Sequence, residues 1–437
     1  MNVPRAFHLP GLDPAALGSQ SLATTGLSIP RLHLEHVQAQ WAELDAAARR
    51  WRRRSLAVRA RVVARVAREL RQAGPGDWQE ALALSTGLSP AGLAAAWDVV
   101  FAPWDTAGID ALLRQEHAAG VAASRWPSRI VHVLAGNVLP PVFAMLARGF
   151  LVGAAQWLRP ASREPLFAVC LADRLRELEP ELSDACAVLW WAHGEPTEAA
   201  VLAAAAVVTA QGEDATIAAL RTRLAAVAPR VRFVGYGSRW SAALLSRDAQ
   251  TEPGARSLAR DIALFDQQGC LSPSLVLAED GPQLEPWCQS LARSLADAQN
   301  ALPRGALSDP ARAGLRAWRE RMRVGVALGE VRRLWEGEGT TWSVVLLASP
   351  RFVESPLDRQ VPVVPFRSQE EIEAVLGDRR DTLQGLATDL LGWDAARRAA
   401  VLAWLRPTRI APPGTLQLAP PAWAQDHAPP LRSLLVD

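Results

Sequence analysis

The sequence contains no lysine, so all 47 basic side chains among its 437 residues are arginine. Chemistry that needs a lysine amine is therefore excluded, namely Schiff-base catalysis, anchoring of pyridoxal phosphate and the Walker A phosphate loop. Cysteine is scarce as well, and the four residues (Cys170, Cys186, Cys270 and Cys288) form no C-x-x-C pair and show no metal-ligand spacing. We therefore expect reduced thiols in a cytoplasmic protein that binds no metal.

Charge of one dominant sign and long apolar runs are also missing. The 47 basic and 45 acidic residues give a net charge of +2, which offers no reason to expect nucleic acid or a membrane surface as a partner. The first 30 residues contain no basic segment followed by an apolar run, so the sequence predicts no secretory signal. The most apolar region, residues 131–158, includes His132, Asn137, Arg148 and two prolines, which argues against a membrane span.

Several common catalytic signatures are absent from the chain. It has no H-E-x-x-H and no G-x-S-x-G segment. Gly235 and Gly237 begin a Rossmann-like fingerprint, but Trp240 stands where that fingerprint needs its third glycine. Function must therefore be inferred from the arrangement of elements and from single residues.

The pattern of apolar residues predicts an α/β fold. The first 30 residues are loop-like, and helical patterns follow at residues 32–73 and 77–113, the second broken near Pro90 and Pro103. From residue 129 onward, strands alternate with helices, which is typical of a mostly parallel sheet with helices on both faces. The expected strands are residues 130–134, 154–158, 185–190, 205–209 and 232–234, and the expected helices are residues 139–150, 164–178 and 213–226.

A second α/β region begins near Ser241. Its expected strands are residues 274–277, 343–347 and 361–364, and its expected helices are residues 283–300, 369–376 and 393–405. The proline-rich C-terminal segment is poor in helix signals. We expect a division into residues 1–240, which hold a helical N-terminal region and a first α/β domain, residues 241–405, which form a second α/β domain, and residues 406–437, a tail that packs back on the first domain.

Cys270 follows Gly269 and precedes Pro273, and β-prone residues come after it. Glycine and proline interrupt regular structure, so we expect Cys270 on a tight loop that opens into a strand. A thiol in such a place can be a nucleophile, whereas a single cysteine taken alone is more often an inert, buried residue.

Polar residues follow two of the expected strands. Asn137 lies on a Gly-Asn turn, where it is either a turn residue that tolerates left-handed geometry or an amide donor to a developing oxyanion. Arg159 and Ser162 come at the carboxyl end of the next strand, the edge where parallel α/β sheets bind ligands. An arginine and a hydroxyl there suit a ribose or its 2′-phosphate, and Ser162 is also a suitable N-cap for the next helix.

This order of features resembles the aldehyde dehydrogenase superfamily, and within it the LuxC-type branch of acyl-CoA reductases, the fatty-acid reductases of bacterial bioluminescence. The resemblance covers roughly residues 100–437. It implies an aldehyde-dehydrogenase-like α/β fold, with a Rossmann-type cofactor domain within residues 1–240 and a catalytic domain in residues 241–405 that carries Cys270. The matching segments are Leu134-Ala-Gly-Asn137, Arg159-Pro-Ala-Ser162, Gly237-Ser-Arg-Trp-Ser241, Phe265-Asp-Gln-Gln-Gly-Cys-Leu-Ser-Pro273, Arg409-Ile-Ala-Pro-Pro-Gly414 and Trp423-Ala-Gln-Asp426.

The resemblance implies a role for each matched residue. It makes Cys270 the nucleophile that accepts the acyl group and Asn137 an oxyanion donor. The residues assigned to the cofactor are Arg159 and Ser162 at the adenosine ribose, Gln211 and Gly212 by the pyrophosphate, and Gly235 and Gly237 by the nicotinamide. The family also implies an acyl-CoA or acyl-carrier thioester as substrate, and a homo-oligomer or an acyl-transferase subunit as partner.

Departures from the superfamily pattern predict the direction of the reaction. Dehydrogenases that hydrolyse their thioester carry a glutamate near the position of Gly235, and no carboxylate stands there in this chain. This absence favours reduction of a thioester to an aldehyde over hydrolysis to an acid. Arg159 replaces the family's lysine, and because a guanidinium can bind a phosphate with two hydrogen bonds, this favours NADP(H). His132 and His193 are candidate proton donors, although a structural role suits either histidine.

Three alternatives to an acyl-CoA reductase stay open at the level of sequence. One is an aldehyde dehydrogenase that oxidises aldehydes to acids. Another is a non-catalytic acyl-binding subunit with the same fold. The third is an unrelated cysteine hydrolase, which would bind no NADP(H).

Overall fold

The computed structural model describes residues 5–120, 125–136 and 139–436. The chain divides into two compact units. Unit 1 comprises Met1–Thr86, Trp97–Ser238 and Pro420–Asp437, and unit 2 comprises Gly87–Ala96 and Arg239–Ala419. The expected α/β class is confirmed in both units.

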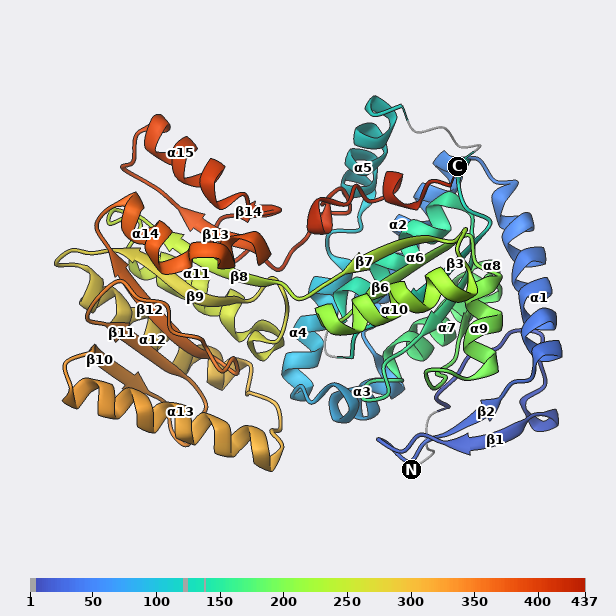
Figure 1. Cartoon of the computed structure of the whole chain (residues 1–437), viewed down its shortest axis with the longest axis horizontal. Helices are drawn as coiled ribbons and strands as arrows, with labels where there is room; N and C mark the ends of the chain where they lie inside the picture. Colours follow the sequence, from blue (N-terminus) through green and yellow to red (C-terminus); the bar gives the residue numbers. More distant parts are fainter. Residues whose placement is uncertain (1–4, 121–124, 137–138, 437) are drawn as a thin grey trace. The chain divides into compact units, whose positions relative to one another are not determined.

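Unit 1 is built on a sheet whose described strands are all parallel (Figure 1). The strands are β3 (Arg129–Val133), β4 (Ala155–Arg159), β5 (Cys186–Val188), β6 (Val207–Gln211) and β7 (Arg232–Tyr236). Their order is β5-β4-β3-β6-β7, so the chain moves outward from β3 in one direction and then returns to its other side at β6. In open α/β sheets, ligands bind at such a reversal, outside the carboxyl ends of the strands.

Helices connect these strands and pack against them (Figure 1). They are α6 (Pro140–Val152), α7 (Phe167–Leu178), α8 (Pro180–Asp184), α9 (Pro196–Ala203) and α10 (Asp214–Val227). The helix α6 begins at Pro140, as expected for prolines in a first helical turn. Strand–helix alternation therefore predicted this unit closely.

The N-terminal region of unit 1 differs from the expectation in two places. Residues predicted as loop form a hairpin of β1 (Gly18–Ser21) and β2 (Ser28–Arg31). The predicted helical pattern at residues 32–73 is two helices, α1 (Leu34–Arg52) and α2 (Leu56–Ala73). The break occurs because Ser55 starts a new helix, its hydroxyl accepting a hydrogen bond from Val58 N.

Three further helices follow in the region predicted to be helical. They are α3 (Gln79–Thr86), α4 (Pro90–Phe101) and α5 (Thr106–Ala118). The breaks fall near Pro90 and Pro103, as expected from the sequence.

Unit 2 contains a second, mostly parallel sheet in which only β10 of the described strands runs antiparallel to its neighbour. Its order is β10-β11-β12-β9-β8-β13-β14. The strands are β8 (Trp240–Leu245), β9 (Pro273–Glu279), β10 (Val331–Glu336), β11 (Ser343–Leu347), β12 (Gln360–Phe366), β13 (Leu383–Asp389) and β14 (Arg409–Ala411). The helices are α11 (Glu252–Ala263), α12 (Leu284–Ala301), α13 (Asp309–Ala327), α14 (Gln369–Leu376) and α15 (Ala395–Leu405).

The C-terminal segment is shared between the two units. Residues up to Ala419 belong to unit 2, where Arg409 Nε donates to Leu416 O at 2.7 Å. Residues from Pro420 onward belong to unit 1, where Leu431 N donates to Glu116 Oε1 at 3.2 Å. The division into residues 1–240, 241–405 and 406–437 stays a prediction about domains. None of the described helices has the length and apolar character needed to cross a bilayer.

Candidate active site

Cys270 lies on a turn between a helix and a strand of unit 2. The helix α11 runs into a short 3-10 turn, Leu264–Gln267, and β9 begins at Pro273. Between them, Ser272 N donates to Gly269 O at 2.8 Å, which closes a tight turn around Cys270. The expected tight loop that opens into a strand is therefore confirmed.

Burial separates Cys270 from the other three cysteines. Cys170, Cys186 and Cys288 are buried, whereas Cys270 is half-buried. Burial raises the pKa of the Cys186 thiol to about 12 and also raises the pKa values of Cys170 and Cys288. Because the thiolate is the nucleophilic form, burial makes these three thiols poor nucleophiles, and Cys270 is the most exposed of the four cysteines.

Side chains from three distant parts of unit 2 hold the turn. Ser241 Oγ, at the start of β8, donates to the carbonyl oxygen of Cys270 at 2.6 Å. Gln267 Nε2 donates to Pro273 O at 2.8 Å, and Gln417 Nε2 donates to Ser272 Oγ at 2.7 Å. Since the carbonyl of Cys270 itself is bonded, the peptide plane that follows Cys270 has a fixed orientation.

Gly385 of β13 makes room for this turn. A Cβ atom at that position would lie 2.7 Å from Ser241 Oγ and 2.9 Å from Leu271 Cδ2. Both distances are shorter than a van der Waals contact, so any larger residue would push on the turn that carries Cys270.

In unit 1 the predicted cofactor residues gather at one edge of the sheet. Arg159 ends β4, Gln211 ends β6, and Gly212 and Gly237 follow directly on strands β6 and β7. Because these strands are parallel, their carboxyl ends meet at one edge. Gly235 differs, since it lies inside β7 and pairs with Ala210. Asn137, the predicted oxyanion donor, lies outside the described residues.

The turn after β3 is packed closely against the turn after β4. A Cβ atom on Gly136 would lie 2.8 Å from the Cβ of Ala161, so this approach requires glycine. Small residues thus let the turns after β3 and β4 approach each other at the carboxyl edge of the sheet.

Arg159 is a buried cation at this edge. Its Nε donates to Trp191 O at 3.0 Å, and its guanidinium carbon lies 5.6 Å from the ring centre of Trp190. Burial lowers the pKa of Arg159 to about 10, while Glu198 and Glu195 oppose the shift. The side chain therefore keeps its positive charge at neutral pH and is held in one orientation by aromatic rings.

Ser162 does not cap the following helix. Instead, Glu164 Oε1 accepts hydrogen bonds from Leu166 N at 3.0 Å and Phe167 N at 2.8 Å, which makes Glu164 the capping side chain of α7. The carbonyl oxygen of Ser162 accepts a hydrogen bond from Thr24 Oγ1 at 2.6 Å. The interpretation of Ser162 as an N-cap is wrong, and its hydroxyl is not needed for helix capping.

The two candidate histidines occupy different environments. His132 Nδ1 lies 2.7 Å from Thr209 Oγ1, His132 Nε2 lies 3.0 Å from Gln156 Oε1, and burial lowers the pKa of His132 to about 4. With both ring nitrogens bonded inside the core, His132 is a structural residue. His193 follows β5, has a side chain that is 59% exposed, and contacts Glu198 Oε1 through Nδ1 at 3.0 Å.

Comparison with known proteins agrees with this arrangement. A family model described as acyl-CoA reductase (LuxC) matches residues 109–436. The chain is similar to a long-chain acyl-protein thioester reductase of Aliivibrio fischeri, with 26% identity over 247 residues, which cover 55% of this chain and 50% of the relative. It is also similar to one of Vibrio harveyi, with 28% identity over 181 residues, which cover 40% and 37%. The matches thus span half or less of these relatives.

Solved structures with the same fold are aldehyde dehydrogenases. An NAD-dependent benzaldehyde dehydrogenase from Corynebacterium glutamicum superposes with a TM-score of 0.67 at 14% identity, covering 94% of both chains. An aldehyde dehydrogenase from Brucella melitensis biovar abortus 2308 gives a TM-score of 0.68 at 15% identity, covering 93% of this chain and 89% of the other. At such low identity these matches establish the fold alone.

Proposed function

The chain belongs to the LuxC family of acyl-CoA reductases, and we propose that it reduces an acyl thioester to an aldehyde through an acyl-enzyme on Cys270. The observation that carries this proposal is the placement of Cys270. It is the half-buried member of four cysteines, and it sits on a turn whose carbonyl is fixed by Ser241.

In the first step the thiolate of Cys270 attacks the carbonyl carbon of the thioester. The bond between that carbon and the carrier sulfur breaks, and the carrier leaves as a thiolate that takes a proton from solvent. The cofactor supplies a hydride to the acyl carbon when it is bound. The resulting thiohemiacetal breaks its carbon–sulfur bond, which releases the aldehyde and restores the cysteine thiolate. We assign Asn137 and the backbone N–H of Cys270 as donors to the oxyanion in both tetrahedral species.

Reduction is favoured over hydrolysis by the packing around Gly235. A Cβ atom there would lie 2.6 Å from Ile217 Cγ2, so β7 has no room for the glutamate that activates water in hydrolytic relatives. Without a general base at this position, attack of water on the acyl-enzyme is slow, which favours hydride transfer.

We assign the cofactor as NADP(H), bound at the carboxyl edge of the unit 1 sheet. The strand reversal between β3 and β6, the glycines Gly136 and Gly212 in the turns after these two strands, and the buried cation of Arg159 fit a dinucleotide. In this assignment Arg159 and Ser162 hold the adenosine ribose and its 2′-phosphate. Gln211 and Gly212 lie by the pyrophosphate, and Gly235 and Gly237 border the nicotinamide.

The names of the similar reductases suggest the substrate. They are described as long-chain acyl-protein thioester reductases. We therefore assign a long acyl chain carried as a thioester, on CoA or on a protein such as an acyl-transferase subunit. The cysteine pattern separately leads us to propose a cytoplasmic location.

The test is oxidation of NADPH against a panel of acyl-CoA thioesters of increasing chain length. Wild type should consume NADPH and release an aldehyde, whereas Cys270→Ala should lose at least about 10³-fold in rate, because the covalent route is removed. Cys288→Ala, which removes a buried thiol of the same unit, is the matched control and should retain activity. Turnover by Cys270→Ala at the wild-type rate would contradict the proposal.

A further inference from the structure

Two short segments with left-handed backbone lie next to the cysteine turn in unit 2. Nine described residues other than glycine have positive φ, and six of them form two uninterrupted runs. The first run is Phe265, Asp266 and Gln267, with φ of 55°, 49° and 67°. The second is Leu357, Asp358 and Arg359, with φ of 66°, 51° and 65°. Side chains disfavour this region, so such runs persist only where surrounding contacts enforce them, often at functional sites.

The two runs are joined by a buried ion pair. Arg359 Nη2 and Nε donate to Asp266 Oδ1 at 2.5 and 3.0 Å, and the two side chains are 1% and 9% exposed. Gln268 Nε2 donates to Asp358 Oδ1 at 3.0 Å, which adds a second bridge. The other oxygen of Asp266 accepts a hydrogen bond from Gly305 N at 2.9 Å. Both oxygens of Asp266 are therefore bonded.

Arg359 is also fixed from the side of the helices. Its Nη1 donates to Gln299 Oε1 on α12 at 3.0 Å, and its Nη2 donates to Ala263 O at the end of α11 at 3.3 Å. One guanidinium thus ties α11, α12 and the second run to the segment that precedes Cys270. This fork of donors is a geometry that arginine provides and lysine does not.

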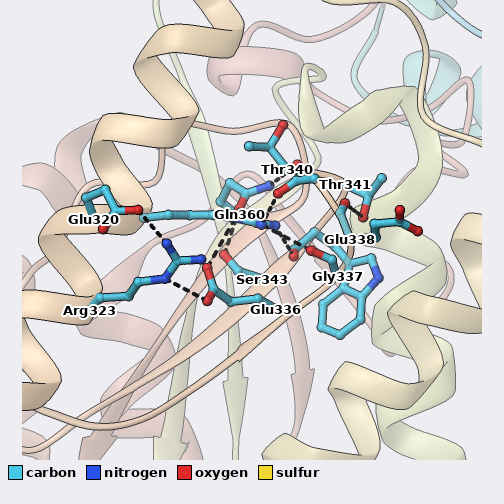
Figure 2. Close-up of polar contacts among 12 residues, drawn as sticks. Glu320, Arg323, Glu336, Gly337, Glu338, Thr340, Thr341, Ser343 and Gln360 are labelled. Atoms are coloured by element: carbon cyan, nitrogen blue, oxygen red, sulfur yellow. Dashed lines mark hydrogen bonds and ion pairs between the residues drawn. The ribbon is translucent and has the colours of Figure 1, made fainter.

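A further polar network is joined to the second run through Gln360. Gln360 Nε2 donates to Asp358 O at 2.8 Å. It also donates to Thr340 O at 3.1 Å (Figure 2). Gln360 Oε1 accepts from Ser343 Oγ at 2.7 Å and from Arg319 Nε at 3.1 Å. Arg319 is only 3% exposed, so the support of the run that carries Arg359 lies inside the unit.

We propose that Asp266 and Arg359 are positioning residues that hold the Cys270 turn in the geometry needed for attack on the thioester. The inference rests on the proposed function, because it takes Cys270 as the nucleophile. Asp266 stands four residues before Cys270, and its backbone conformation sets the direction in which the chain enters the Gly269–Ser272 turn. The ion pair enforces that conformation against its intrinsic cost.

The test compares two reactions of Cys270. Acylation by a long-chain acyl-CoA requires an aligned nucleophile, whereas alkylation by iodoacetamide requires only a reachable thiolate. Alkylation reports on Cys270 because the other three thiols are buried with raised pKa values. The variants are Arg359→Met, Asp266→Asn and Arg359→Lys. The control is Glu279→Gln, which alters another buried carboxylate that contacts an arginine, Arg397, at the far end of β9.

Arg359→Met and Asp266→Asn should lower the acylation rate by about 10²-fold, since a displacement of about 1 Å costs that much. The alkylation rate should stay within about threefold of the wild-type rate. General loosening of the fold would change both rates, so a loss of acylation alone indicates a misaligned nucleophile. Arg359→Lys keeps the charge and should recover about tenfold of the loss, and Glu279→Gln should acylate like wild type. If Arg359→Met does not fold, Asp266→Asn and Arg359→Lys decide the question.

Acylation within threefold of wild type in the folded variants would overturn the inference, and so would an equal fall of acylation and alkylation. Failure of the proposed function has a different signature. In that case wild type itself would not be acylated, or Cys270→Ala would be acylated as readily as wild type.

Discussion

At the scale of single residues, reactivity in this chain is decided by burial. Three of the four cysteines, Cys170, Cys186 and Cys288, are buried, and desolvation raises the pKa values of their thiols and disfavours the nucleophilic thiolate. The sequence predicted that the fourth, Cys270, lies on a turn, because Gly269 and Pro273 interrupt regular structure on either side of it. Burial also determines the state of Arg159. Aromatic rings and the carbonyl oxygen of Trp191 hold its guanidinium in one orientation at the edge of the unit 1 sheet.

Replacing Arg159 should reveal the cofactor preference. We expect Arg159→Met to raise the dissociation constant of NADPH by about 10- to 100-fold, because a charged hydrogen bond to the 2′-phosphate contributes about 1.5–3 kcal/mol. The dissociation constant of NADH should change little. Titration of tryptophan fluorescence measures both, since Trp190 and Trp191 lie against the guanidinium.

The neighbouring Arg163 provides a matched control, because it is an exposed arginine on the same turn. Arg163→Met should leave the ratio of the two dissociation constants unchanged. A larger loss of NADPH affinity in Arg163→Met than in Arg159→Met would contradict the assignment of Arg159.

Some residues of the site were not predictable from the sequence. Asp266 and Arg359 are 93 positions apart, and their ion pair leaves no local pattern. The signal that was available is the pair of charged residues, Asp358 and Arg359, directly before a fully buried strand, β12. Buried charges need partners, and that rule points to a counter-charge nearby.

At the scale of elements, hydrogen bonds between distant segments determine how the cysteine turn is held, which the local sequence pattern does not predict. Hydrogen bonds of Asp261 and Gln417 join three parts of unit 2, namely the helix α11, the segment after β14 and the cysteine turn. Asp261 Oδ2 accepts a hydrogen bond from Gly414 N at 2.6 Å, and Gln417 Nε2 donates to Asp261 O at 3.2 Å as well as to Ser272 Oγ. Burial raises the pKa of Asp261 to about 6, although these backbone donors oppose the shift.

This carboxyl group predicts a pH dependence of stability. Because its folded pKa lies above the ordinary value of 3.8, the folded protein holds the proton more tightly than the unfolded chain between about pH 4 and pH 6. The stability contributed by the neutral acid is complete below about pH 4 and is lost as the pH rises through 6. Asp261→Asn should therefore raise the free energy of unfolding by about 1–3 kcal/mol at pH 7.5 and leave it nearly unchanged at pH 4.

Denaturant unfolding at the two pH values measures this effect. An equal change in unfolding free energy at pH 4 and pH 7.5 would show that the carboxyl group does not titrate as described.

The strand β13 and the helix α13 were not predicted from the sequence. The strand β13 contains a glycine and a buried glutamine, Gln384, in place of an uninterrupted β-branched run, so packing against neighbouring strands supplies the stability that strand propensity does not. The helix α13 buries Leu315, Trp318 and Met322 at helical spacing, but arginine occupies many of its other positions, and the apolar pattern is therefore sparse.

At the scale of the whole molecule, strand–helix alternation predicted two parallel sheets because each crossover must return over its own sheet. It did not predict how the chain is divided between the units. Residues 87–96 belong to unit 2 although both flanking segments belong to unit 1, and the C-terminal segment changes unit after Ala419. Such divisions depend on long-range contacts, which a local pattern does not encode.

The proposed function depends on transfer of an acyl group from a thioester to Cys270. Mass spectrometry of the intact protein, mixed with a long-chain acyl-CoA and no nicotinamide cofactor, detects this transfer. We predict one added acyl group per chain, located by peptide mapping on Cys270 and released by neutral hydroxylamine. Absence of the adduct, or its location on any other residue, would contradict the account.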